Sequence, residues 1–498
     1  MSLAIVHSRA QVGVEAPSVT VEAHLSNGLP SLALVGLPET AVKESKDRVR
    51  SAILNCAFEF PLRRITLNLA PADLPKDGGR FDLAIALGIL AASGQVPAEA
   101  ITGIECLGEL ALSGELRSVQ GVLPAALAAR AAGRTLVVPR SNAEEASLAS
   151  GLNVIAVDHL LELVAHLSGV SPLSPYQAQG LVRQCAPYPD LQDVQGQLAA
   201  KRALLVAAAG SHNLLLTGPP GTGKTLLASR LPGLLPPLGE QEALEVAAIQ
   251  SVVSLTPMNA WPQRPFRHPH HTASGPALVG GGSRPKPGEI TLAHHGVLFL
   301  DELPEFDRRV LEVLREPLES GQIVIARAKD KVRFPARFQL VAAMNPCPCG
   351  YLGDPNNRCR CSPEQQQRYR NKLSGPLLDR IDLHVTVARE TTALYGSDIK
   401  GIDTAAAAAQ VANARALQMS RQGMANAFLD LAGLRSHCRL QPEDHGWLET
   451  ACERLGLSLR AAHRILKVAR TLADLEQCAV ISRAHLAEAL QYRSNSQA

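Results

Sequence analysis

The segment 218–225 constrains the fold more than any other part of this chain. It matches the pattern G-x-x-x-x-G-K-[ST] and consists of Gly218, Pro219, Pro220, Gly221, Thr222, Gly223, Lys224 and Thr225. An apolar run precedes it and a helix-forming run follows it, the context of a phosphate-binding loop between a strand and a helix. Its glycines let successive backbone N–H groups face a phosphate. We therefore expect Lys224 to neutralise β- and γ-phosphate charge and Thr225 to bind Mg²⁺ through its hydroxyl.

A second buried strand is predicted at 296–300, where an uninterrupted apolar run ends in Asp301 and Glu302. Ligand sites of α/β proteins lie at the carboxyl ends of parallel strands. We expect Asp301 to orient the Mg²⁺ ion and Glu302 to polarise an attacking water. The alternative is a pair of solvated acids after a core strand.

Three further polar residues occupy positions that suit nucleotide hydrolysis. Asn345 ends the predicted strand 338–344, where an amide can hold the lytic water. Arg380 follows a Gly-Pro pair that interrupts regular secondary structure, and it precedes a predicted strand, 383–387. In this position it can reach the γ-phosphate of a neighbouring subunit. Arg460 lies in the first turn of a predicted helix, which disfavours a cation unless an anion is near. The alternatives are a local strand cap, an Arg380–Asp382 ion pair and a solvated arginine.

Four cysteines are clustered directly after Asn345, at Cys347, Cys349, Cys359 and Cys361. Two pairs of thiols at this spacing can form a tetrahedral Zn²⁺ site, and we predict a zinc knuckle at 347–361. The C-x-C spacing is less usual than C-x-x-C. Redox-active or idle thiols are the alternative.

Basic residues gather on a predicted hairpin whose strands lie at 322–326 and 332–334. A hairpin of this kind suits a phosphate backbone; a solvated edge protected by lysine is the alternative. An insertion at about 255–288, rich in histidine and glycine, is interpreted as a functional loop; a metal site and a surface excursion without function are the alternatives. The basic residues expected to contact phosphates are Arg327, Lys329, Lys331, Arg333 and, from the insertion, Arg267.

The 498 residues are too many for one core, so two to four domains are expected. Proline and glycine indicate a linker at 169–190, between an N-terminal domain, 1–168, and a core, 191–390, with an amphipathic helix at 308–319. From 391 to 498 the pattern is that of a helical lid. The sequence lacks a membrane-length apolar run and a signal-peptide pattern, so a cytoplasmic location without membrane contact is expected. A net charge of +3 is too small to establish a nucleic-acid partner.

The N-terminal domain has an α+β pattern and resembles the proteolytic domain of Lon, most clearly around Asp77, Gly78 and Gly79. Where that family has its nucleophilic serine and its lysine, this chain has Arg80 and Leu123. Peptide hydrolysis therefore has no evident chemistry here. The resemblance implies a Lon-like fold that serves assembly or binding.

The order of the motifs, from the phosphate-binding loop to Arg460, resembles that of AAA+ ATPases. This resemblance implies an α/β P-loop core with a helical lid, and it gives Asn345 and Arg460 the two sensor roles of that class. It also places Val194 and Gln195 beside the adenine.

Longer motifs are more specific, namely 267–271, 287–290, 293–306 and 345–350. With the N-terminal domain they resemble the magnesium-chelatase-like ComM/YifB family over nearly the whole chain. The resemblance implies a ring-forming, hexameric DNA motor that uses ATP and Mg²⁺ and promotes branch migration in natural transformation or recombination. A metal-insertion motor with a porphyrin-binding partner and an ATP-dependent protease are the competing interpretations.

Overall fold

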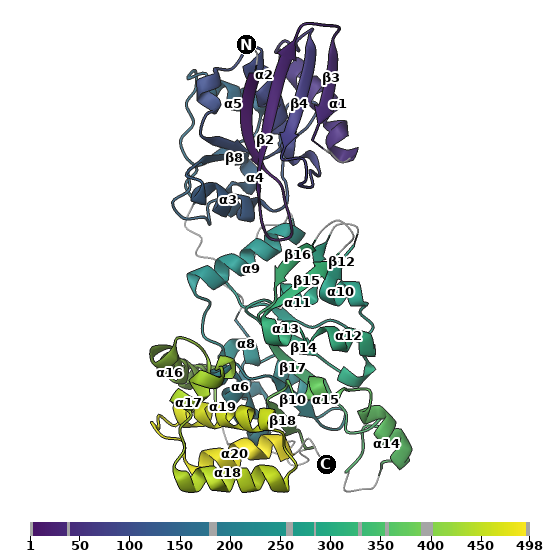
Figure 1. Cartoon of the computed structure of the whole chain (residues 1–498), viewed down its shortest axis with the longest axis vertical. Coiled ribbons are helices and arrows are strands. Elements are labelled where there is room, and N and C mark those ends of the chain that lie inside the picture. The colour runs from purple at the N-terminus through teal and green to yellow at the C-terminus, as the bar shows by residue number, and fades with distance from the viewer. Residues whose placement is uncertain are drawn as a thin grey trace. The chain divides into compact units, whose positions relative to one another are not determined.

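The structure is a computed structural model, and it describes residues 3–36, 40–178, 187–254, 262–282, 285–326, 331–353, 358–389 and 402–494 (Figure 1). The chain forms two compact units, one of Met1–Gln184 with Ala243–Trp261 and one of Cys185–Glu242 with Pro262–Ala498. None of the helices in the described part combines the length and apolar character needed to cross a lipid bilayer.

The first unit contains a seven-stranded mixed sheet with the order β3-β4-β2-β1-β5-β8-β9. The strands alternate between buried and exposed residues where one face meets the core, as in β2. They are β1 (Leu3–Arg9), β2 (Ser18–Ser26), β3 (Ser31–Val35), β4 (Arg64–Ala70), β5 (Ile104–Cys106), β8 (Thr135–Pro139) and β9 (Val154–Val157).

The helices of this unit include α2 (Asp82–Ala92), which is buried along almost its whole length and packs on β1 and β2. The others are α1 (Thr40–Asn55), α3 (Val122–Ala131), α4 (Arg140–Ala146) and α5 (Leu160–Leu167). The strands and helices confirm a mixed α/β unit; its likeness to Lon stays a prediction.

Helix α9 (Glu240–Val253) follows the phosphate-binding loop in sequence, yet most of it packs in the first unit. Leu244, Ala247 and Ala248 form a buried cluster with Leu123 at the start of α3. The backbone oxygen of Ser251 accepts a hydrogen bond from the Gly121 N–H at 2.9 Å. The domain boundary expected at 169–190 places α9 in the second unit and therefore misses this packing. The amphipathic pattern of a helix shows that one face is buried, but it does not show which core that face joins.

The second unit is built on a five-stranded sheet with the order β11-β14-β17-β10-β18, in which every pairing is parallel. Its strands are β10 (Leu214–Thr217), β11 (Phe266–Arg267), β14 (Val297–Leu300), β17 (Gln339–Met344) and β18 (Leu383–Thr386). Strand β10, which leads into the phosphate-binding loop, lies between β17 and β18. This arrangement confirms the predicted α/β P-loop core.

The lid helices gather in one cluster (Figure 1), and they share a hydrophobic core with the sheet and with α6 (Leu198–Gly210). Because of this common core, the expected core and lid domains form one compact unit. The lid helices are α16 (Thr404–Gln422), α17 (Leu431–His437), α18 (Pro442–Arg454), α19 (Leu459–Leu475) and α20 (Arg483–Ser494).

The prediction of one continuous helix at 308–319 is wrong. The chain forms α12 (Arg308–Val313) and then α13 (Pro317–Ser320). Pro317 has no N–H group, so it cannot continue the hydrogen-bond pattern of α12, and it occupies the first position of α13 instead. The hairpin that follows has the predicted form, with β15 (Gln322–Ala326) antiparallel to β16 (Lys331–Pro335).

Candidate nucleotide-binding site

The phosphate-binding loop joins β10 to α7 (Lys224–Ala228) and borders a cavity of about 460 Å³. Gly223 immediately before α7 has a φ of +85°, a conformation that glycine adopts without strain. The Lys224 ammonium donates hydrogen bonds to the backbone oxygens of Gly218 at 2.7 Å and Pro219 at 2.9 Å. Burial lowers the pKa of Lys224, while Asp301 and Glu302 oppose that shift. The lysine is thus held inside the loop, where phosphate oxygens can replace the carbonyls.

Thr225 and Asp301 meet at the same cavity, as the sequence predicted. The Thr225 hydroxyl donates a hydrogen bond of 2.6 Å to Asp301 Oδ2. A hydroxyl and a carboxylate are oxygen ligands of the type that Mg²⁺ prefers. The residues present therefore fit a magnesium ion, held by Thr225 and Asp301.

Glu302 also lines the cavity, in a left-handed conformation with φ of +52°. Non-glycine residues seldom adopt this conformation, and such strained residues cluster at functional sites. Its carboxylate oxygen lies 3.1 Å from Nδ1 of His271. The sequence pattern places His271 in a functional loop but assigns it no partner. The Arg-His-Pro-His-His run is the one local signal that this residue has a specific role.

Asn345 follows β17 and reaches the phosphate-binding loop from the neighbouring strand. Its side-chain oxygen accepts a hydrogen bond of 3.1 Å from Lys224. Gly350, a few residues after the strand's end, has a φ of +83°, and a Cβ there would lie 2.7 Å from Pro220 Cδ and 3.8 Å from Asn345 Cγ. Only glycine lets the cysteine segment approach the phosphate-binding loop so closely.

The four clustered cysteines converge on one point. The Cys347 sulfur lies 3.4 Å from that of Cys349 and 3.7 Å from that of Cys359, and the four sulfurs all lie within 4.8 Å of one another. Four thiolates at about 2.3 Å from one tetrahedral Zn²⁺ would be about 3.8 Å apart. The cluster therefore fits a closed zinc site.

Three family models of magnesium-chelatase type match the chain. They are "Magnesium chelatase, subunit ChlI" at 190–394, "Subunit ChlI of Mg-chelatase" at 21–142 and "Magnesium chelatase, subunit ChlI C-terminal" at 401–493. The Competence protein ComM of Haemophilus influenzae is 54% identical over 99% of this chain and 98% of its own length. The protein YifB of Escherichia coli is 52% identical over 99% of this chain and 97% of its own length. This chain belongs to the ComM/YifB family of magnesium-chelatase-like AAA+ proteins.

The pairwise match to a magnesium-chelatase subunit covers only part of this ComM/YifB chain. The 38 kDa subunit of Rhodobacter capsulatus magnesium chelatase is 28% identical over 36% of this chain and 55% of its own length. Together, the family and the phosphate-binding site indicate an ATPase that uses ATP and Mg²⁺.

In this ComM/YifB protein, the two predicted arginines meet on one carboxylate away from the phosphate-binding cavity. Arg380 Nη2 lies 2.6 Å from Glu319 Oε1, and Arg460 binds the same oxygen. Burial would raise the pKa of Glu319, but hydrogen bonds from Arg380 and Arg460 lower it. Neither arginine lines the cavity at the phosphate-binding loop. The alternative considered for Arg380, an ion pair with Asp382, is not observed between these two described residues; Asp382 pairs with Arg464 instead.

The predicted adenine contacts do not border the described cavity either. Val194 is buried in the core of the second unit, while Gln195 is exposed. Their proposed contact with a base stays a prediction.

The basic residues predicted to contact DNA phosphates in this ComM/YifB chain differ in exposure and in their ion-pair partners. Lys331 and Arg333 are exposed and alternate with the buried Val332 and Phe334 along β16. Arg327 and Lys329 lie outside the described residues. Arg267 is bound by both carboxylate oxygens of Glu289, at 2.6 and 2.7 Å, so its guanidinium is already engaged.

The histidines of the insertion make several different contacts, and the rings of His270 and His271 lie 4.2 Å apart. The His268 ring lies 4.7 Å from that of Phe299, and His270 contacts Thr272 at 2.8 Å, whereas His271 pairs with Glu302. The interpretation of the insertion as a functional loop stays a prediction.

The two positions of the Lon comparison are both buried. Arg80 donates a hydrogen bond of 2.9 Å to the backbone oxygen of Gln120, and burial lowers its pKa to about 10. Leu123 is fully buried. Among the described residues of 3–178, no hydrogen bond joins a serine hydroxyl to a lysine ammonium.

Proposed function

We propose that this protein is an ATP-driven, ring-forming DNA motor that moves branched DNA during natural transformation or recombination. The observation that carries the proposal is the joint arrangement of Lys224, Thr225, Asp301, Glu302 and Asn345 around one cavity. A relative named for competence, matched over almost the full length of both chains, supports the biological setting.

The cavity residues divide the work of hydrolysis. Lys224 exchanges its carbonyl partners for phosphate oxygens, which places its charge beside the group to be transferred. Thr225 and Asp301 hold Mg²⁺, which supplies charge neutralisation for the phosphates. Glu302 accepts a proton from the attacking water, and Asn345 orients that water.

Arg380 and Arg460 would link ATP hydrolysis to assembly of the ring. Because both bind Glu319 away from their own phosphate-binding cavity, they are suited to a nucleotide held by another copy of the chain. A γ-phosphate would replace the Glu319 carboxylate as their partner, so hydrolysis requires a ring. We propose that the ring is a hexamer.

DNA is held by the β15–β16 hairpin. Lys331 and Arg333 project from one face of β16, where they contact phosphates without reading bases. Sequence-independent contacts suit a motor that moves along any sequence. The cysteine cluster binds one Zn²⁺ and keeps the segment after Asn345 packed on the phosphate-binding loop.

A metal-insertion motor is the alternative, favoured by the partial match to the 38 kDa magnesium-chelatase subunit. Measuring ATP hydrolysis without DNA and with single strands, duplex or a four-way junction separates the two. A DNA motor is stimulated by DNA and moves the junction. An ATPase that is active but indifferent to every DNA would favour the metal-insertion motor.

A further inference from the structure

A second cavity, of about 430 Å³, lies at the amino ends of the parallel strands, whereas the phosphate-binding loop lies at their carboxyl ends. Gln339, the first residue of β17, lines this cavity, whereas Met344 and Asn345 at the other end of β17 line the nucleotide cavity. The walls come from the core of the second unit and from the lid helix α16. Nothing in the function proposed above uses this cavity.

Positive charge dominates the cavity. Arg264, Arg337 and Arg415 all line it, and Glu242 is the one carboxylate among its described lining residues. Glu242 is already engaged, with Arg264 Nη2 at 3.3 Å and His295 Nδ1 at 3.6 Å. The site thus holds more cationic than anionic charge.

Arg415 is only partly satisfied. Its Nη2 donates to the Ala208 backbone oxygen and to the Ser211 hydroxyl, both at 2.7 Å. Its Nε atom is buried and has no hydrogen-bond partner among the described residues. Burial and the nearby charge of Arg264 lower the pKa of Arg415 to about 10. A buried donor without a partner, beside a like charge, favours an anion.

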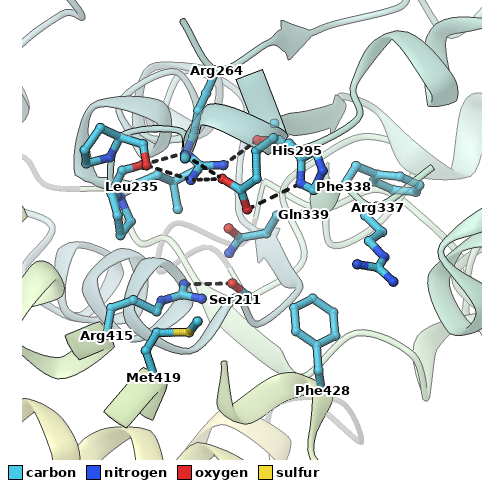
Figure 2. A pocket seen from close by; sticks show the side chains of 15 residues that line it. Ser211, Leu235, Arg264, His295, Arg337, Phe338, Gln339, Arg415, Met419 and Phe428 are labelled. Carbon is cyan, nitrogen blue, oxygen red and sulfur yellow. Dashed lines mark hydrogen bonds and ion pairs between the residues drawn. The ribbon is translucent and has the colours of Figure 1, made fainter. Parts of the chain in front are cut away.

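Arg337 approaches from the other side. Figure 2 shows Arg337 and Arg415 on opposite sides of Gln339, with Phe428 below Arg337 in the view. The Arg337 side chain is exposed, and none of its guanidinium nitrogens has a hydrogen-bond partner among the described residues. Both residues line the same cavity, and a guanidinium group binds phosphate oxygens with paired hydrogen bonds.

Apolar side chains stand beside these cations. Phe428 and Met419 line the cavity, yet they are 61% and 50% exposed. Exposed large apolar residues around a few convergent polar groups are typical of a small-molecule site. A flat ring would cover them while its phosphate met the arginines.

We propose that this cavity binds a small phosphate-bearing ligand of nucleotide size, with its phosphate between Arg337 and Arg415 and its ring against Met419 and Phe428. The ligand would join core residues to the lid helix α16 and so restrict movement between the sheet and the lid. This inference is independent of the proposed action on DNA.

The test uses the full chain carrying Lys224→Ala, so that the phosphate-binding loop contributes little nucleotide binding. Calorimetric titration with dAMP, deoxyadenosine and inorganic phosphate then measures what the second cavity recognises. We expect dAMP to bind at least about tenfold more tightly than either of the other two, because each lacks one half of the recognition.

Adding Arg337→Gln should weaken dAMP binding about tenfold or more, since a charge-assisted hydrogen bond to phosphate is lost. Arg337 has no internal partner to lose among the described residues, so this variant should fold normally, which circular dichroism would verify. Arg435→Gln, which removes an exposed lid arginine outside the cavity, is the matched control and should bind dAMP as before. The proposal is wrong if dAMP does not bind, if Arg337→Gln binds it unchanged, or if deoxyadenosine binds equally well.

Discussion

The Lys224 ammonium lies 3.1 Å from the side-chain oxygen of Asn345, which is 121 residues further along the chain. This contact joins the phosphate-binding loop to the neighbouring strand β17. It also places Lys224, the charge that meets the phosphates, next to the amide that would hold the water. The two residues are far apart in sequence, and the parallel pairing of β10 with β17 brings them together.

Lys224→Ala and Glu302→Gln should separate nucleotide binding from hydrolysis. Loss of the lysine removes charge from the phosphates, so both binding and hydrolysis should fail. Loss of the base should leave ATP bound while hydrolysis falls at least about 100-fold. Binding of a fluorescent ATP analogue and release of phosphate measure the two steps. Normal turnover by Glu302→Gln would show that another group activates the water.

His271→Ala should raise basal ATP hydrolysis about two- to fivefold, the effect of removing roughly 0.5–1 kcal/mol of hydrogen bonding. The 3.1 Å contact with His271 occupies the Glu302 carboxylate, which otherwise accepts a proton from water. The same change made in Glu302→Gln should have no effect, because the carboxylate is already absent. Slower hydrolysis by His271→Ala would mean that the histidine orients Glu302 productively.

Mixing two inactive variants should restore hydrolysis if Arg380 serves a neighbouring subunit. Lys224→Ala keeps Arg380 and Arg380→Ala keeps the phosphate-binding loop, so a mixed ring contains some complete sites. Each variant by itself should be strongly impaired, since such arginines contribute about 10³–10⁵ in rate. Phosphate release is measured across mixing ratios. No recovery in rings proven to be mixed would argue against action between subunits.

Removing the cysteine cluster should impair both metal content and hydrolysis. Elemental analysis should find about one zinc per chain, since four thiolates form a closed site. Cys359→Ser should lose the metal and slow ATP hydrolysis, because the segment with Gly350 packs on Pro220. Cys452→Ala, at a buried cysteine of the lid, is the control and should keep the zinc. A metal-free preparation with full activity would contradict the zinc site.

Lys331→Ala combined with Arg333→Ala should weaken DNA binding while basal ATP hydrolysis stays nearly intact. Each lost phosphate contact should reduce the log–log salt slope of binding by about 0.7–0.9. Both side chains are exposed on β16, so little folding stability is at stake. Fluorescence anisotropy over a salt series and a junction-migration assay provide the readouts. Junction movement at the normal rate would place DNA elsewhere on the protein.

Local pattern was sufficient wherever a role depends on neighbours in the chain. The phosphate-binding loop needs its glycines, lysine and threonine in one short run, and the apolar run before Asp301 forms a buried strand wherever it lies. Parallel strands share one carboxyl edge, so the sequence alone predicts that Asp301 and Asn345 lie beside Lys224. The cysteine cluster was predictable for a related reason, because its four ligands come from one short segment.

Only the tertiary structure decided which distant side chains meet. Nothing near Glu319 in sequence indicates that Arg380 and Arg460 bind it, and nothing near Glu302 indicates His271. Helix α9 shows an apolar face in sequence, but the core it joins depends on shape complementarity with α3. The second cavity likewise depends on how whole elements pack. Arg337 and Arg415 line the same cavity only because α16 packs against the sheet. Pairing over long sequence separations is set by packing of whole elements, which no local pattern encodes.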